Sequence, residues 1–293
     1  IMSANPIIFF IFYFLIVVAV LGFGIVFRKI IFKSSSLFNL GFDGLVGIFI
    51  LTIYSYVSHF FFSHNLEHNF LVILTGLIMF FLNYNKIKYN FELKIFISVF
   101  LILFFAFIAF KTHDDFSYYH FGYTNYINES KFLIGVGNFN HGFRTPSSIF
   151  YLNSLFYLPI VEKYMFHIGA IIIMGYSLIH LITLLNYKFL ERDNDYIFFL
   201  ILLSIIFIFI FFYRISEHGS DRSAQILIFL LFIEIFIFFK FLRTSDIFLG
   251  KILILSSLII SLKSFYFVYF IILIPILFLL KKNDKLGILK NLL

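Results

Sequence analysis

Long runs of apolar residues, separated by short polar segments, follow one another along almost the whole chain. A helix that crosses the hydrocarbon core of a bilayer needs about 20 apolar residues, with a range of about 17–25. The pattern therefore predicts an all-α fold, a polytopic transmembrane helix bundle with about nine spans. We place these spans at Pro6–Phe27, Leu45–Phe62, Phe70–Tyr84, Leu93–Phe110, Tyr164–Leu185, Tyr196–Tyr213, Ala224–Leu242, Ile247–Leu262 and Ser264–Leu280.

Only Lys263 separates the last two predicted spans. One continuous helix from Ile247 to Leu280 would be about 50 Å long at about 1.5 Å per residue, which exceeds the thickness of the hydrocarbon core. We therefore expect a tight hairpin at Lys263.

Composition supports a membrane protein and excludes other classes. The 293 residues are 62% hydrophobic and only 13% charged, whereas soluble domains carry about 25% charged residues. The absence of cysteine excludes disulfides and thiol chemistry. The net charge of +7 is spread over short loops, so we expect membrane lipid and not nucleic acid as the partner.

The distribution of Lys and Arg predicts the orientation. With the N-terminus outside, the inner loops hold about twice as many of these residues as the outer loops, as the positive-inside rule requires. We expect a bacterial inner-membrane protein with its C-terminus inside. Residues 1–92 form an N-terminal three-span segment, and residues 93–293 form a second membrane region. The chain opens with Ile-Met and stops in a Lys-rich segment, so a C-terminally truncated fragment stays an alternative.

The longest predicted outer loop runs from Lys111 to Lys163. Loops longer than about 12–15 residues are usually functional. Its apolar stretches predict interfacial helices. One of them is "RTPSSIFYLNSLFYLP", with Thr145 as N-cap, Pro146 at the first helical position and Pro159 at its end. The loop carries ionisable side chains at His113, Asp114, Asp115, His120, His141 and Arg144.

Further charged groups are predicted on the same outer side. The loop "YRISEHGSDRSAQ" contains Glu217, His218, Asp221 and Arg222, and Lys263 lies at the tip of the final hairpin. Free amides at a helix N-terminus beside Arg144 or Arg222 favour an anion. The combination of carboxylates and cations suits a reaction on a lipid-linked phosphate, in which a carboxylate takes a proton and the cations hold the phosphate.

The segment "THDDFSYYH", at the outer end of a span and before a long loop, resembles the GT-C superfamily of membrane glycosyltransferases. The resemblance covers roughly Leu93–Leu280. It implies a polyprenyl-phosphate-linked sugar as donor, a glycan or lipid as acceptor, and Asp114 or Asp115 as the catalytic carboxylate. By location, Arg222 and Lys263 are candidates for the donor phosphate, as is Arg144. Supporting positions are His113, His120, Glu217, His218 and Asp221.

Plainer interpretations stay open for each group. Asp114 and Asp115 also suit a solvated helix cap, and the cations suit snorkelling anchors. No cofactor is implied, but a divalent metal ion stays an alternative, although the spacing of His113 and His120 does not suit helical ligands. Rival functions are an O-antigen polymerase or ligase, a transporter or flippase, and a scaffold without catalysis.

Glu234 lies in the middle of a predicted span, where an acid costs a few kcal/mol and faces the bundle interior. We favour a structural role over a proton path, and His180 is the most plausible partner.

Overall fold

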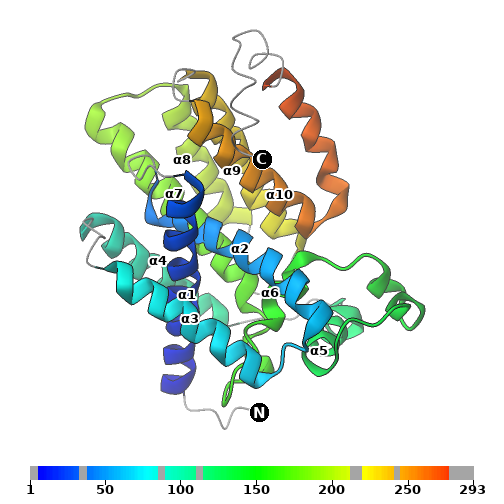
Figure 1. Cartoon of the computed structure of the whole chain (residues 1–293). Coiled ribbons are helices and arrows are strands. Elements are labelled where there is room, and N and C mark those ends of the chain that lie inside the picture. The colour runs from blue at the N-terminus through cyan, green and yellow to red at the C-terminus, as the bar shows by residue number, and fades with distance from the viewer. Residues whose placement is uncertain are drawn as a thin grey trace.

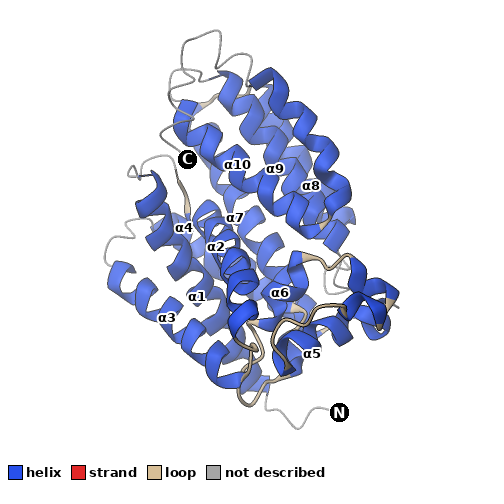
Figure 2. Cartoon of the chain, turned by 45° about the vertical axis from the view of Figure 1, so that its right-hand side comes forward, coloured by secondary structure: helices blue, strands red, loops and turns tan. Residues whose placement is uncertain are grey.

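The computed structural model describes residues 6–32, 38–84, 90–109, 115–211, 220–240 and 245–276. Every regular element in these ranges is a helix (Figures 1 and 2), which confirms the predicted all-α class. The α-helices are α1 (Pro6–Phe32), α2 (Leu40–Phe61), α3 (Leu66–Tyr84), α4 (Asn90–Ile108), α5 (Phe121–Glu129), α6 (Ser148–Ser154), α7 (Ile168–Glu191), α8 (Tyr196–Phe211), α9 (Ser220–Lys240) and α10 (Ser245–Leu262). Tighter or wider helical turns are η1 (Phe116–His120), η2 (Val136–Asn138), η3 (His141–Arg144), η4 (Lys163–Met165) and η7 (Ser264–Ile272).

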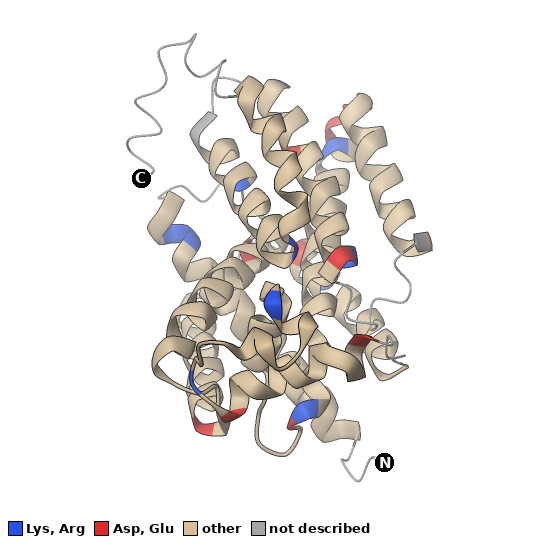
Figure 3. Ribbon diagram, turned by 90° about the vertical axis from the view of Figure 1, so that its right-hand side faces the viewer, with Lys and Arg blue, Asp and Glu red and all other residues tan. Residues whose placement is uncertain are grey.

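Six of the described helices are long and apolar enough to cross a membrane, namely α1, α2, α3, α4, α9 and the segment that contains α7. The apolar helices α8, α10 and Ser264–Ile276 are shorter. The predicted count of nine spans is therefore not confirmed, and four predicted span ends (Phe110, Tyr213, Leu242 and Leu280) lie outside the described residues. Charged residues colour only short, scattered stretches of the ribbon (Figure 3), as expected for a chain surrounded largely by lipid.

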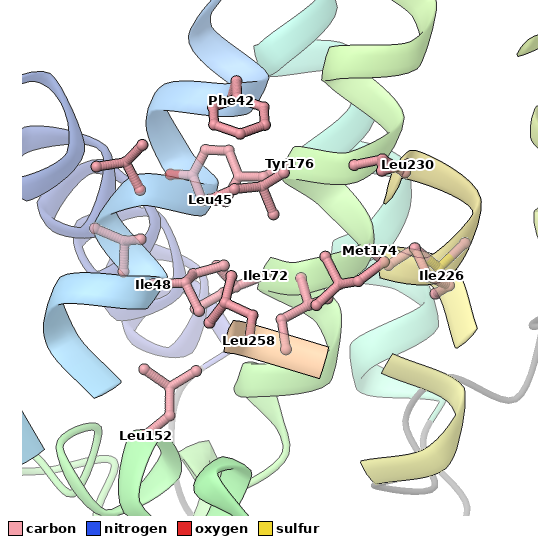
Figure 4. Close-up of a cluster of buried hydrophobic side chains, with 14 of the residues drawn as sticks. Phe42, Leu45, Ile48, Leu152, Ile172, Met174, Tyr176, Ile226, Leu230 and Leu258 are labelled. Carbon is pink, nitrogen blue, oxygen red and sulfur yellow. The ribbon is translucent and has the colours of Figure 1, made fainter. Parts of the chain in front are cut away.

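Helix α7 forms the centre of the bundle. Every residue from Ile168 to Leu181 is buried, which is the behaviour of a helix that is apolar on all sides. Figure 4 shows side chains of α7 between those of α2 and α9. Leu258 of α10 and Leu152 of α6 belong to the same cluster. The core therefore joins the early helices of the chain to the late ones.

Glycines let α1 and α2 approach closely. A Cβ atom added at Gly47 would overlap the carbonyl oxygen of Val20, and one added at Gly24 would overlap that of Asp43. Small residues at such positions bring helix backbones close enough for dense van der Waals packing, which drives helix association in lipid.

The start of α1 and the end of α4 lie at the same end of the bundle. Phe9, in the first turn of α1, stacks on Phe107, in the last turn of α4, with ring centroids 5.1 Å apart. Farther along, the Tyr13 hydroxyl donates to the carbonyl of Phe100. The two helices are thus antiparallel, and the long loop that follows α4 begins at the level where α1 begins.

Helix α6 differs from the expectation for this part of the loop. It begins at Ser148, because the Ser147 hydroxyl caps it by accepting from the backbone N–H of Ile149 at 3.3 Å. Thr145 is therefore not the N-cap, and Pro146 precedes the helix. All seven residues of α6 are buried, so it packs inside the bundle and is not interfacial.

The long loop is tied to the turn between α2 and α3. Asn128 Nδ2 donates to the carbonyls of His64 and Ser154 at 2.6 and 2.8 Å, and Asn69 Nδ2 donates to the same two carbonyls. The His64 ring lies between the hydroxyls of Ser58 and Ser154, at 2.8 and 2.7 Å. Burial, together with nearby His68 and His59, lowers the pKa of His64 to about 2, so its ring is neutral.

Candidate functional site

A cavity of about 710 Å³ lies at the end of the bundle that bears the long loop. Segments that are distant in the sequence form its wall: Asp115 with η1, η3 with the start of α6, the first turn of α9, and the end of α10 with the start of η7. Its acidic, basic and histidine side chains are Asp115, His120, His141, Asp221, Arg222 and Lys263.

Several of these charged side chains lie at the ends of helices. Ser220, Asp221 and Arg222 form the first turn of α9, whose leading amide groups have no acceptor within the helix. Lys263 follows the last residue of α10 and precedes η7. The start of α6 is fastened to the end of α10, because the Ser147 hydroxyl donates to the Leu262 carbonyl at 2.6 Å.

The charges in the cavity are mixed. Lys263 Nζ lies 2.5 Å from Asp221 Oδ2, and each side chain of this ion pair is 45% exposed. Burial, and after it the negative charges of Asp115 and Asp221, raise the pKa of Tyr119. The carboxylates of Asp115 and Asp221 therefore both lie near the Tyr119 hydroxyl, although they belong to distant parts of the chain.

Aromatic side chains pack against His120 in the cavity wall. His120 is buried, with its ring 4.3 Å from that of Tyr119 and 4.8 Å from that of Phe150. A Cβ at Gly142 would overlap the ring of Tyr119, so glycine at this position lets η3 close against η1. The resulting wall holds Tyr119 and His120 at fixed positions beside Asp115.

Five of the ten predicted site residues line this cavity: Asp115, His120, Asp221, Arg222 and Lys263. Four others, His113, Asp114, Glu217 and His218, lie outside the described residues. Arg144 does not line the cavity; it is exposed, and its Nε donates to the Gly137 carbonyl at 3.3 Å.

Sequence reasoning missed several residues of the cavity wall, above all Tyr119, Ser147 and Ser261. The sequence places His141 in the long loop without assigning it to the site. The sequence does indicate a tight turn at His141, because Asn-His-Gly is typical of such turns. In the structure Asn140 Oδ1 accepts from the N–H of Gly142. In the described part of the chain, no group of three or more His, Asp or Glu side chains is arranged to hold a metal ion.

Six described helices that are long and apolar enough to cross a membrane, with a cavity at one end that carries charged side chains, indicate a helical membrane protein. The family model DUF8201, a domain of unknown function, matches residues 7–293, and the chain belongs to this family. No curated protein and no solved structure matches the chain.

Proposed function

We propose that the chain is a membrane glycosyltransferase, similar to the GT-C superfamily, that transfers a sugar from a polyprenyl-phosphate donor to a glycan or lipid acceptor. The observation that carries this proposal is the shared cavity of Asp115, Arg222 and Lys263. A carboxylate and two cations beside one space of about 710 Å³ supply the groups that such a transfer needs.

The cations and the start of α9 would hold the donor phosphate. Amide groups of the first turn of α9 and the side chains of Arg222 and Lys263 favour an anion. The phosphate would take the place of Asp221 at Lys263. This exchange costs little, because an exposed ion pair contributes only about 0–1 kcal/mol.

Asp115 would act as the general base. It takes the proton of the acceptor hydroxyl, whose oxygen forms a bond to the anomeric carbon of the sugar. The bond from that carbon to the phosphate oxygen breaks, and the phosphate leaves with the electron pair, stabilised by Arg222 and Lys263. Asp114 is the alternative base.

We further propose that α8, α10 and the helix from Ser264 also cross the membrane, which gives nine spans with the N-terminus outside. The cavity then faces the outer leaflet of a bacterial inner membrane. This orientation rests on the excess of Lys and Arg in the opposite loops.

Asp114→Asn and Asp115→Asn test the mechanism in membranes that contain equal amounts of each variant. We expect loss of the base to lower sugar transfer from a polyprenyl-phosphate donor by about 10²–10⁴-fold. The matched control is Glu129→Gln, an exposed acid of the same loop, which should transfer sugar at the parent rate.

Full activity in both aspartate variants would contradict the proposal. If transfer were lost with Arg222→Ala and kept in both aspartate variants, an O-antigen polymerase or ligase mechanism would replace it.

A further inference from the structure

A second polar cluster lies inside the bundle, away from the cavity. It joins Asn39, at the start of α2, to His180 of α7, Glu234 of α9 and Lys251 of α10. His180, Glu234 and Lys251 are each at most 2% exposed. The predicted contact of His180 with Glu234 is confirmed, at 2.9 Å between Nε2 and Oε1. Lys251 Nζ, which the sequence did not indicate as a partner, donates to the same Oε1 at 3.2 Å.

Asn39 determines which nitrogen of His180 carries hydrogen. The backbone N–H of Phe42 donates to Asn39 Oδ1 at 2.9 Å, and Asn39 Nδ2 donates to the His180 carbonyl. Both contacts require the amide in this orientation, because a backbone N–H only donates and a carbonyl only accepts. Oδ1 also contacts His180 Nδ1 at 3.0 Å. Since this oxygen can only accept, Nδ1 must carry a hydrogen.

The contact between His180 Nε2 and Glu234 Oε1 therefore needs a proton of its own. With hydrogen on Nδ1, a neutral imidazole presents a lone pair at Nε2, and an ionised carboxylate presents lone pairs at Oε1. Two acceptors 2.9 Å apart would repel each other. One proton between them makes the contact favourable, either as imidazolium with carboxylate or as imidazole with carboxylic acid.

The neighbouring helices place further charged groups near this pair. Arg28 of α1 pairs with Asp43 of α2 at 2.6 Å, and Glu92 of α4 accepts from the backbone N–H of Leu40. The rings of Phe38, Phe42 and Phe248 surround the Lys251 ammonium at 5.0–5.5 Å, and Phe38 also contacts Arg28.

The charged groups that the neighbouring helices place near this pair are thus Arg28, Lys29, Asp43, Glu92 and Lys251.

We propose that His180 and Glu234 form a proton-binding site inside the membrane bundle, completed by Lys251 and Asn39. The bound proton joins α7 to α9. Through Asn39 and Lys251 it also links these helices to α2 and α10. Release of the proton leaves two acceptors in contact, so the packing of α7 against α9 depends on its presence. This inference does not depend on glycosyl transfer.

Magnetic resonance of the whole protein in lipid bilayers, with isotope-labelled histidine, tests the site directly. The signal of His180 is identified by its absence in His180→Asn. We expect either an imidazolium or a neutral ring with hydrogen on Nδ1. A neutral ring with hydrogen on Nε2 alone would overturn the proposal. This measurement needs no change at Glu234, so it does not depend on the folding of a variant there.

A pH titration then tests whether the proton exchanges. As the pH rises, we expect loss of either the imidazolium signal of His180 or the infrared band of a protonated carboxyl group. In Glu234→Gln no carboxyl group is left to share a proton with His180, so the imidazolium signal and the carboxyl band of Glu234 should both be absent, and His180 should stay neutral.

Glu92→Gln is the matched control, because it removes a buried carboxylate near this cluster and leaves the contact of His180 with Glu234 intact. In this variant the proton shared by His180 and Glu234 should be released as the pH rises, as in the parent protein. A parent protein that shows no change at any pH, or a Glu234→Gln variant that titrates like the parent, would overturn the proposal.

Discussion

His64 shows how one neutral ring holds several backbone segments together. It is fully buried between two serine hydroxyls, and its carbonyl receives hydrogen bonds from Asn69 and Asn128. The Ser154 hydroxyl donates to the Tyr151 carbonyl at 2.7 Å, so it accepts from His64 Nδ1. Ser58 can then donate to Nε2, which completes a neutral set of donors and acceptors.

This arrangement predicts that acid loosens the long loop. The pKa of His64 is lowered to about 2 by burial and by the neighbouring histidines, whereas an unfolded histidine titrates near about 6.5. The opened state therefore binds the proton first, and local stability falls by about 1.4 kcal/mol for each pH unit below about 6.5. Hydrogen exchange of α5 and α6, corrected for intrinsic rates, should show about tenfold less protection per unit.

His64→Asn should remove most of this pH dependence while lowering protection at neutral pH. His141→Asn, at an exposed histidine of the same loop, is the control, and its protection should depend on pH as in the parent protein. Protection that stays constant between pH 7 and pH 5 in the parent protein would contradict the assignment.

At the scale of elements, the contact of α1 with α2 depends on backbone approach more than on large side chains. Gly47 faces the Val20 carbonyl and Gly24 faces the Asp43 carbonyl. Arg28 and Asp43, near the same crossing, add a buried ion pair at 2.6 Å. Breaking such a pair leaves one charge unpaired in a medium of low dielectric, so the close approach also protects the ion pair.

Gly47→Ala should therefore destabilise the bundle by at least about 1–3 kcal/mol, because the added methyl group overlaps backbone that cannot rotate away. Reversible unfolding in mixed micelles measures the change. Gly122→Ala is the matched control, because its Cβ would meet the Phe143 ring at 3.4 Å, an ordinary contact. Equal stabilities of the two variants would contradict this account of the crossing.

For the whole molecule, orientation in the membrane can be tested on a cysteine-free background. Ile134 is 96% exposed in the long loop, and Asn194 is exposed in the connection between α7 and α8. The proposed topology places the first outside and the second inside. A membrane-impermeant maleimide should label Ile134→Cys in intact spheroplasts and Asn194→Cys only after permeabilisation. The reverse pattern would place the cavity on the cytoplasmic side.

The helical class and most helix positions were predictable because long apolar runs have few alternatives in lipid. The contact of His180 with Glu234 was also predicted, since a buried acid needs a partner. The part played by Lys251 was missed because hydrophobicity places a residue along a span without giving the rotation of the helix.

The cavity was predictable only in part. The sequence indicated Asp115, Asp221, Arg222 and Lys263 as one outer set, because helix ends on one side of a membrane share a surface. Arg144 was expected among them but turns to the Gly137 carbonyl. The start of α6 was misplaced at Thr145 because Ser147, two residues farther along, supplies the capping hydroxyl.

Helix α10 has Lys251 in its first turns and ends beside Lys263. The twelve residues from Lys251 to Leu262 span about 18 Å of rigid rod at about 1.5 Å each. The Ser147–Leu262 hydrogen bond couples the far end of this rod to the cavity wall. An axial shift of α10 at Lys251 would therefore reach the backbone at Lys263, because the buried polar cluster and the cavity lie at two ends of one helix.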